Sequence, residues 1–142
     1  MPADGLKAAS RGDFSVFRVG PERLWLTGPA DEGVFGKIDE AVLGGQSVVT
    51  EIGHSRTIIR ISGAPSPTVL NRGLPIDLDD KAFPPGSFAQ SVIHHIPVLV
   101  HRIDAGGEPA FDVYMTREYA LSFWAWLIEA AEPFGGQVGE GQ

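Results

Sequence analysis

Short apolar stretches, each ended by glycine or proline, constrain the fold of this chain more than any other feature. Residues 14–19 and 23–27 flank a Gly20-Pro21-Glu22 turn, and residues 110–115 follow a turn that contains Gly106-Gly107. Turn residues between alternating or β-branched runs are typical of strands that fold back on themselves. The same pattern predicts further strands at residues 47–52, 56–62, 91–96 and 98–103.

Helical periodicity is found in two longer stretches. Residues 31–42 place their large apolar side chains on one face, and residues 117–132 do the same behind Thr116 as a predicted cap. In the second stretch the predicted apolar face comprises Ala120, Phe123, Trp124, Leu127, Ala130 and Ala131. Ser66 is expected to cap a third, short helix that ends at Gly73. The layout predicts an α+β fold, with a mostly antiparallel sheet and helices on one face. We expect a flexible arm at 1–13, a single domain at 14–134 and a flexible tail at 135–142.

Residues 72–90 form a connection that carries three prolines, two glycines and three aspartates. The same stretch also holds large apolar side chains, which a flexible linker lacks because it buries nothing. We therefore expect an ordered loop that packs against other residues. Asp77 and Asp79 follow part of a calcium-loop spacing, but the glycine and terminal glutamate of such a loop are missing. These carboxylates are expected to bond to nearby backbone N–H groups instead.

Composition narrows the functional classes. The 142 residues suit one domain with a real core. The formal charge of −7 argues against a nucleic-acid partner, because a phosphate backbone requires a basic surface. The chain has no cysteine and no apolar run long enough to span a membrane. A cytoplasmic protein is expected.

The residues that could carry chemistry do not form a recognisable site. His94 and His95 lie next to each other in a predicted strand, so their side chains should point to opposite faces. His54 and His101 add no zinc-ligand spacing, and Ser55 beside His54 lacks a nucleophile elbow. A metal-dependent hydrolase is therefore the weakest hypothesis. We expect no catalytic, cofactor-binding or metal-binding residue on this chain.

Large side chains at the edge of the predicted core could instead form an interface with a partner protein. Tyr119 and Trp126 flank the apolar face of the last helix, where amphipathic rings favour interfaces. The ordered loop is expected to expose apolar groups beside rigid backbone. The predicted interface comprises Arg72, Leu74, Asp77, Phe83, Pro84, Phe88, Tyr119 and Trp126.

Several segments between residues 19 and 135 resemble the gamma subunit of heterotetrameric sarcosine oxidase. The most specific ones are Gly73-Leu74-Pro75-Ile76-Asp77-Leu78, Ala82-Phe83-Pro84-Pro85-Gly86-Ser87 and Ser122-Phe123-Trp124-Ala125-Trp126-Leu127. Val19-Gly20-Pro21-Glu22-Arg23-Leu24-Trp25-Leu26, Gly53-His54-Ser55-Arg56-Thr57, Ile61-Ser62-Gly63, Pro97-Val98-Leu99-Val100-His101-Arg102 and Ala110-Phe111-Asp112-Val113-Tyr114 support them.

The resemblance implies a fold similar to the folate-binding domain of aminomethyltransferases. It also implies a non-catalytic gamma subunit that stabilises a large alpha subunit, within an enzyme that demethylates sarcosine to glycine and passes the one-carbon unit to tetrahydrofolate. FAD, FMN, NAD and tetrahydrofolate would be held by partner subunits, with alpha in direct contact and beta and delta joined through the assembly. Family members have a longer segment before the Gly-Pro-Glu-Arg turn, so a fold truncated at the N-terminus is expected.

Two alternatives to this role are open. Related N-methyl amino acid dehydrogenases or demethylases share such subunits, which leaves the amine substrate and the electron acceptor unassigned. A stand-alone folate-binding module is the other alternative, although the sequence shows few convergent polar groups of the kind that a pocket needs.

Overall fold

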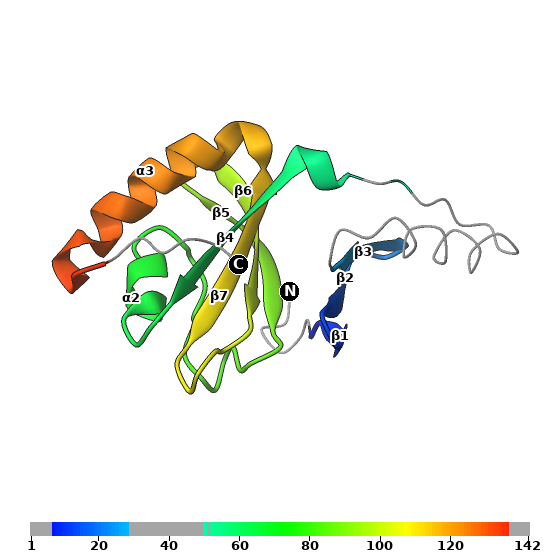
Figure 1. The fold of residues 1–142 in the computed structure, drawn as a ribbon, viewed down its shortest axis with the longest axis horizontal. Helices are drawn as coiled ribbons and strands as arrows, with labels where there is room; N and C mark the ends of the chain where they lie inside the picture. Colours follow the sequence, from blue (N-terminus) through cyan, green and yellow to red (C-terminus); the bar gives the residue numbers. More distant parts are fainter. Residues whose placement is uncertain (1–6, 29–49, 51, 137–142) are drawn as a thin grey trace, which may run out of the picture.

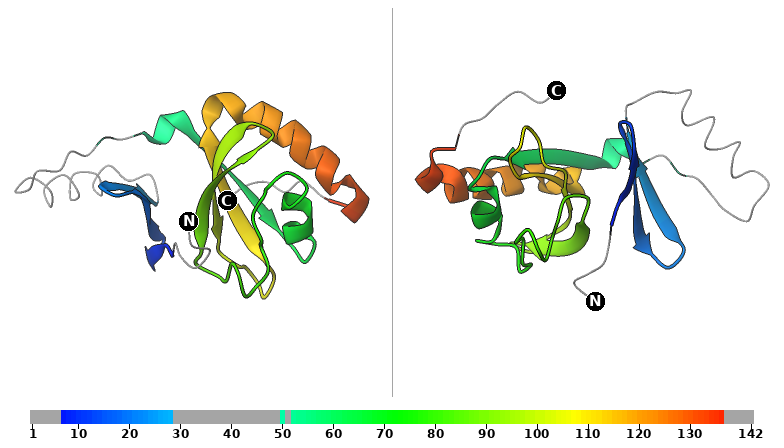
Figure 2. Two further views of the ribbon diagram at one scale, coloured as in Figure 1. Left: turned by 180° about the vertical axis from the view of Figure 1, so that it is seen from behind. Right: turned by 90° about the horizontal axis from the view of Figure 1, so that it is seen from below.

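The computed structural model describes residues 7–28, 50 and 52–136, which form three layers (Figure 1). The strands are β1 (Ala9–Arg11), β2 (Phe14–Gly20), β3 (Arg23–Thr27), β4 (Arg56–Ser62), β5 (Phe88–Ile93), β6 (Ile96–Arg102) and β7 (Ala110–Thr116). The helices are α2 (Ser66–Leu70) and α3 (Ala120–Ala131), with short 3₁₀ turns η1 (Gly53–Ser55), η2 (Arg117–Tyr119) and η3 (Glu132–Phe134). The helices lie on one side of a four-stranded sheet, and the β1–β3 sheet lies on the other (Figure 2).

The four-stranded sheet is antiparallel throughout and has the order β4-β7-β6-β5. β4 is rich in β-branched residues, which favour a pleated and packed surface. β4 pairs with β7 along its whole length, from Arg56 opposite Thr116 to Ser62 opposite Ala110. This sheet confirms the α+β class and the mostly antiparallel arrangement that the sequence predicts. Among the described residues, no helix is long and apolar enough to cross a membrane.

The main core lies between this sheet and the helices. Alternate residues of the two central strands, among them Val98 and Val100 on β6, point towards α2 and α3. From α3, Phe123 and Leu127 meet them at helical spacing. Leu74, Leu78 and Phe83 of the 72–90 loop close the open side of the same core, so the prediction of an ordered, packed loop is confirmed.

A second, smaller core joins the β1–β3 sheet to the opposite face of the four-stranded sheet. Phe17 of β2 is fully buried there and meets Phe88, His101 and Tyr114 edge-on, with ring centroids 4.8–5.5 Å apart. Backbone N–H of Ala8 donates to the carbonyl of Gly86, and Gln90 Nε2 donates to the carbonyl of Val19. Residues 7–13 therefore contain the strand β1, which pairs with β2, whereas the sequence predicts a flexible arm over residues 1–13.

Several local predictions differ from the structure. His94 and His95 are not in a strand: both have positive φ and form the two-residue turn between β5 and β6. Ser66 does not cap α2, because Pro65 occupies the cap position and Ser66 Oγ is buried with no hydrogen-bond partner. Thr116 likewise makes no cap bond. The predicted helix at 31–42 and most of the predicted strand at 47–52 lie outside the described residues.

Candidate functional site

The predicted interface residues of the 72–90 loop fall into two groups. Leu74, Phe83 and Phe88 are at most 4% exposed, because they complete the two cores of this chain. The premise that the loop exposes these apolar groups is wrong for all three. Arg72 and Asp77 are exposed and Pro84 is half-buried, so these residues still have surface to offer a partner.

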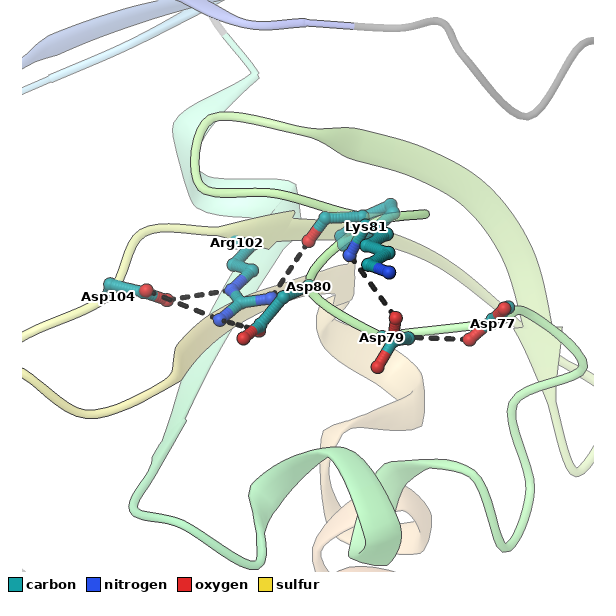
Figure 3. Close-up of polar contacts among 7 residues, drawn as sticks. Asp77, Asp79, Asp80, Lys81, Arg102 and Asp104 are labelled. Atoms are coloured by element: carbon teal, nitrogen blue, oxygen red, sulfur yellow. Dashed lines mark hydrogen bonds and ion pairs between the residues drawn. The ribbon is translucent and has the colours of Figure 1, made fainter.

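One buried side chain on β6 fixes this loop in place. Arg102 Nη1 donates to the carbonyl of Phe83 at 3.0 Å, while its Nε donates to Asp104 at 2.8 Å and its Nη2 meets Asp80 at 2.7 Å (Figure 3). The hydrogen bond with Asp104, together with the nearby carboxylates, raises the pKa of the Arg102 guanidinium. The guanidinium thus ties the loop to the sheet, which is a structural role.

The aspartates that precede this contact behave as turn residues. Backbone N–H of Asp79 donates to Asp77 Oδ1 at 2.9 Å, and that of Lys81 donates to Asp79 Oδ2 at 3.3 Å (Figure 3). These bonds confirm the expected use of the carboxylates. Among the described residues, no group of three or more histidine or acidic side chains could hold a metal ion.

The two tryptophans of α3 differ from the prediction in how far each is exposed. Trp126 is half-buried, with its ring 5.7 Å from that of Phe123 and 5.8 Å from that of His94. Trp124, which the sequence places in the core, is 37% exposed. Trp126 can enter because it lies over Gly73, where an added Cβ would stand 2.8 Å from its ring. Tyr119 remains at the surface, as predicted, and is 36% exposed.

A polar hollow lies between the β1–β3 sheet and the outer face of the four-stranded sheet. Its volume is about 570 Å³, and its lining includes Arg60, His101, Asp112, Tyr114 and Thr27. Arg60 and Asp112 are directly opposite each other on β4 and β7. Arg60 Nε and Nη2 donate to the two Asp112 oxygens at 2.8 and 3.1 Å, a bidentate pair.

The electrostatics of this hollow follow from burial and from that ion pair. The hydrogen bond with Asp112 raises the pKa of Arg60. Burial lowers the pKa of His101, against the opposing effect of Asp112, and burial raises the pKa of Tyr114. At neutral pH the hollow thus presents a neutral imidazole and a protonated phenol beside a matched ion pair, which can hydrogen-bond a ligand of little net charge.

The sequence alone does not predict that the residues lining this hollow come together. Arg60 and Asp112 are 52 positions apart, and neither matches a motif. The available signal was a charged residue inside each of two otherwise apolar strands, Thr-Ile-Ile-Arg-Ile and Ala-Phe-Asp-Val-Tyr. The buried Asp112 requires a partner, but only the strand register shows which one.

Comparisons with known proteins agree with this architecture. The sarcosine oxidase gamma subunit of Arthrobacter sp is 28% identical over 130 residues, which cover 92% of this chain and 63% of that protein. The gamma subunit of Corynebacterium sp. (strain P-1) is 24% identical over 133 residues, covering 94% and 64%. The resemblance that the sequence motifs indicate is thereby confirmed. The chain spans less than two thirds of the length of these two curated relatives.

A solved structure shares the fold. The heterotetrameric sarcosine oxidase from Corynebacterium sp. U-96 in complex with pyrrole 2-carboxylate contains a chain that superposes with a TM-score of 0.85 at 19% identity, over 98% of this chain and 70% of the other. The GCVT N-terminal domain family matches residues 7–140. Because that match takes in nearly the whole sequence, this chain belongs to the GCVT N-terminal domain family.

Proposed function

We propose that this chain is a non-catalytic gamma-type subunit of a heterotetrameric sarcosine oxidase, in which it stabilises a large alpha subunit. The observation that carries the proposal is similarity along 92% and 94% of the chain to two proteins named as gamma subunits. In this role FAD, FMN, NAD and tetrahydrofolate belong to the partner subunits, and the assembly works in the cytoplasm.

The pairing of the charges on the four-stranded sheet supports a structural role. The donors of Arg102 bind the loop and two aspartates, and Arg60 is matched to Asp112. Charges paired in this way hold elements together. A reacting group, in contrast, needs a free lone pair or a mobile proton directed at substrate.

Native purification through a tag on this chain tests the proposal. We expect a large flavin-containing subunit to co-elute, as identified by mass spectrometry, and sarcosine oxidation to reside in the complex. The isolated chain should lack flavin absorbance and amine oxidation. Recovery of the wild-type chain as an active monomer would refute the subunit role.

Activity assays on the same purified complex identify its substrate and its electron acceptor. Activity on sarcosine with oxygen as electron acceptor would support an oxidase. Turnover of another N-methyl amino acid with a different acceptor would instead place the chain in a related dehydrogenase or demethylase.

The polar hollow favours one second candidate, a stand-alone module that binds a folate-like ligand. Its convergent groups, among them His101 and Tyr114, supply the polar lining that the sequence did not indicate. Trp25 packs against the same small core, so titration with tetrahydrofolate should quench tryptophan fluorescence if the module binds it. An unchanged signal at saturating ligand would eliminate this candidate.

A further inference from the structure

The outward face of α3 carries a row of apolar side chains that nothing in the described residues covers. Leu121 is 84% exposed, Trp124 37% and Ile128 44%. The positions i, i+3 and i+7 lie on one face of a helix, so the three form a continuous stripe. Ala125 lies in the same row. We call Leu121, Trp124, Ala125 and Ile128 the α3 stripe.

Packing among the described residues does not explain the α3 stripe. The opposite face of the helix, with Phe123, Leu127 and Ala130, already seals the main core. Scattered exposed apolar residues need no explanation, but a row along one helix is typical of an interaction surface.

The charges along one flank of the α3 stripe are acidic, while the exposed Arg117 lies just before its N-terminal end. Glu118 and Glu129 lie along one flank and Glu132 at the end, and all three are exposed. From Glu118 to the last residue the sequence contains no lysine or arginine. The nearest cation described at the C-terminal end is Arg72, whose guanidinium lies 5.8 Å from the Phe134 ring centroid.

This distribution of charge favours one kind of binding partner for the α3 stripe. A second copy of the chain would bring the same acidic flank against itself in a two-fold pair, and each copy carries a formal charge of −7. A surface with an apolar centre and a rim of lysine and arginine would match both the stripe and its flank.

We propose that the α3 stripe docks on a different polypeptide, through an apolar patch of that partner bordered by basic residues. The inference rests on the proposed subunit role and adds the face and the chemistry of contact. A single helical row is smaller than the roughly 800 Å² that each partner buries in a stable interface. The α3 stripe is therefore the centre of a larger contact.

The test uses the tagged full chain in its complex with the co-eluting large subunit. Leu121→Glu and Ile128→Glu place a charge in the centre of the stripe, and we expect each to weaken association by about tenfold or more. Glu129→Lys should also weaken association and should make it less sensitive to salt. Leu24→Glu is the matched control, since Leu24 is 65% exposed on β3 and should leave affinity within about twofold.

The possible outcomes separate the two proposals. If the wild-type chain recovers no large subunit, the subunit role fails and this inference fails with it. If the complex forms and the two stripe variants bind as tightly as wild type, only the docking face is wrong. Light scattering that shows a wild-type homodimer, dissociated by Leu121→Glu, would make a second copy the occupant and overturn the proposed chemistry. Because these side chains are exposed, thermal unfolding of all variants should match wild type.

Discussion

Arg102 Nη1 donates a hydrogen bond to the backbone carbonyl of Phe83 at 3.0 Å, across the boundary between a central strand and the proline-rich loop. The same guanidinium meets Asp104 and Asp80 and lies 5.7 Å from the ring centroid of Phe111. A single side chain therefore satisfies a buried carbonyl and joins three segments.

Arg102→Met should destabilise the fold by about 2–4 kcal/mol, because it leaves the Phe83 carbonyl without a partner and releases two carboxylates. Urea unfolding followed by circular dichroism measures the change. Asp80→Asn is the control: its side chain is 82% exposed, so the loss should stay below about 1 kcal/mol. Equal losses in the two variants would show that the loop does not depend on Arg102.

Gly73→Ala should cost about 1–3 kcal/mol, because the new Cβ would stand 2.8 Å from the Trp126 ring and 3.0 Å from Ile93. The shift of Trp126 should also change the tryptophan emission spectrum. Gly53→Ala meets no atom within 4 Å and should change the free energy of unfolding by less than about 1 kcal/mol. A neutral Gly73→Ala would mean that Trp126 is not held over this glycine.

The positions of Trp124 and Trp126 show what the sequence could and could not predict. Strand identity at β2, β3, β4 and β7 follows from alternation and turn residues, and those predictions are confirmed. The half-burial of Trp126 depends on Gly73, which is 53 positions away, and no local pattern reports that contact.

The turn at His94 and His95 was missed for a different reason. Two-residue hairpin turns with positive φ at both positions usually contain asparagine, aspartate or glycine, and a histidine pair gives no such signal. The Arg60–Asp112 pair was missed because strand register alone brings the two residues together.

Phe17→Ala should release the β1–β3 sheet, because Phe17 supplies the central ring of the smaller core. The expected loss is about 3 kcal/mol or more. Hydrogen exchange should show faster exchange of β2 and β3 amides, while β7 amides, which lie in the larger sheet, change less. Leu24→Ala on the same hairpin removes an exposed side chain and should leave exchange unaltered. A uniform increase over both sheets would show that they unfold as one unit.

The pH dependence of stability should carry a contribution from His101. Burial lowers its pKa in the folded state, so below the unfolded value of about 6.5 the unfolded chain binds more protons. The free energy of unfolding should therefore fall as pH is lowered below about 6.5, with a slope of at most about 1.4 kcal/mol per pH unit from this one group.

His101→Gln removes the titrating group and should flatten that slope. The measurement is urea unfolding of both proteins at a series of pH values on either side of about 6.5. Parallel curves for His101→Gln and wild type would assign the acid sensitivity to other groups.

Proline at the second position of β6 has a consequence for how the sheet meets other chains. Pro97 lies opposite Val92, next to the Ile93–Ile96 pair that closes the hairpin, so its backbone nitrogen points away from β5. β7 pairs with β6 only from Leu99 to Arg102, which leaves this end of β6 as an overhang among the described strands. An overhanging edge with a free N–H would offer a template for strand addition, and the ring of Pro97 removes that donor. The hairpin can therefore project beyond its neighbour with a lower risk of edge-to-edge aggregation.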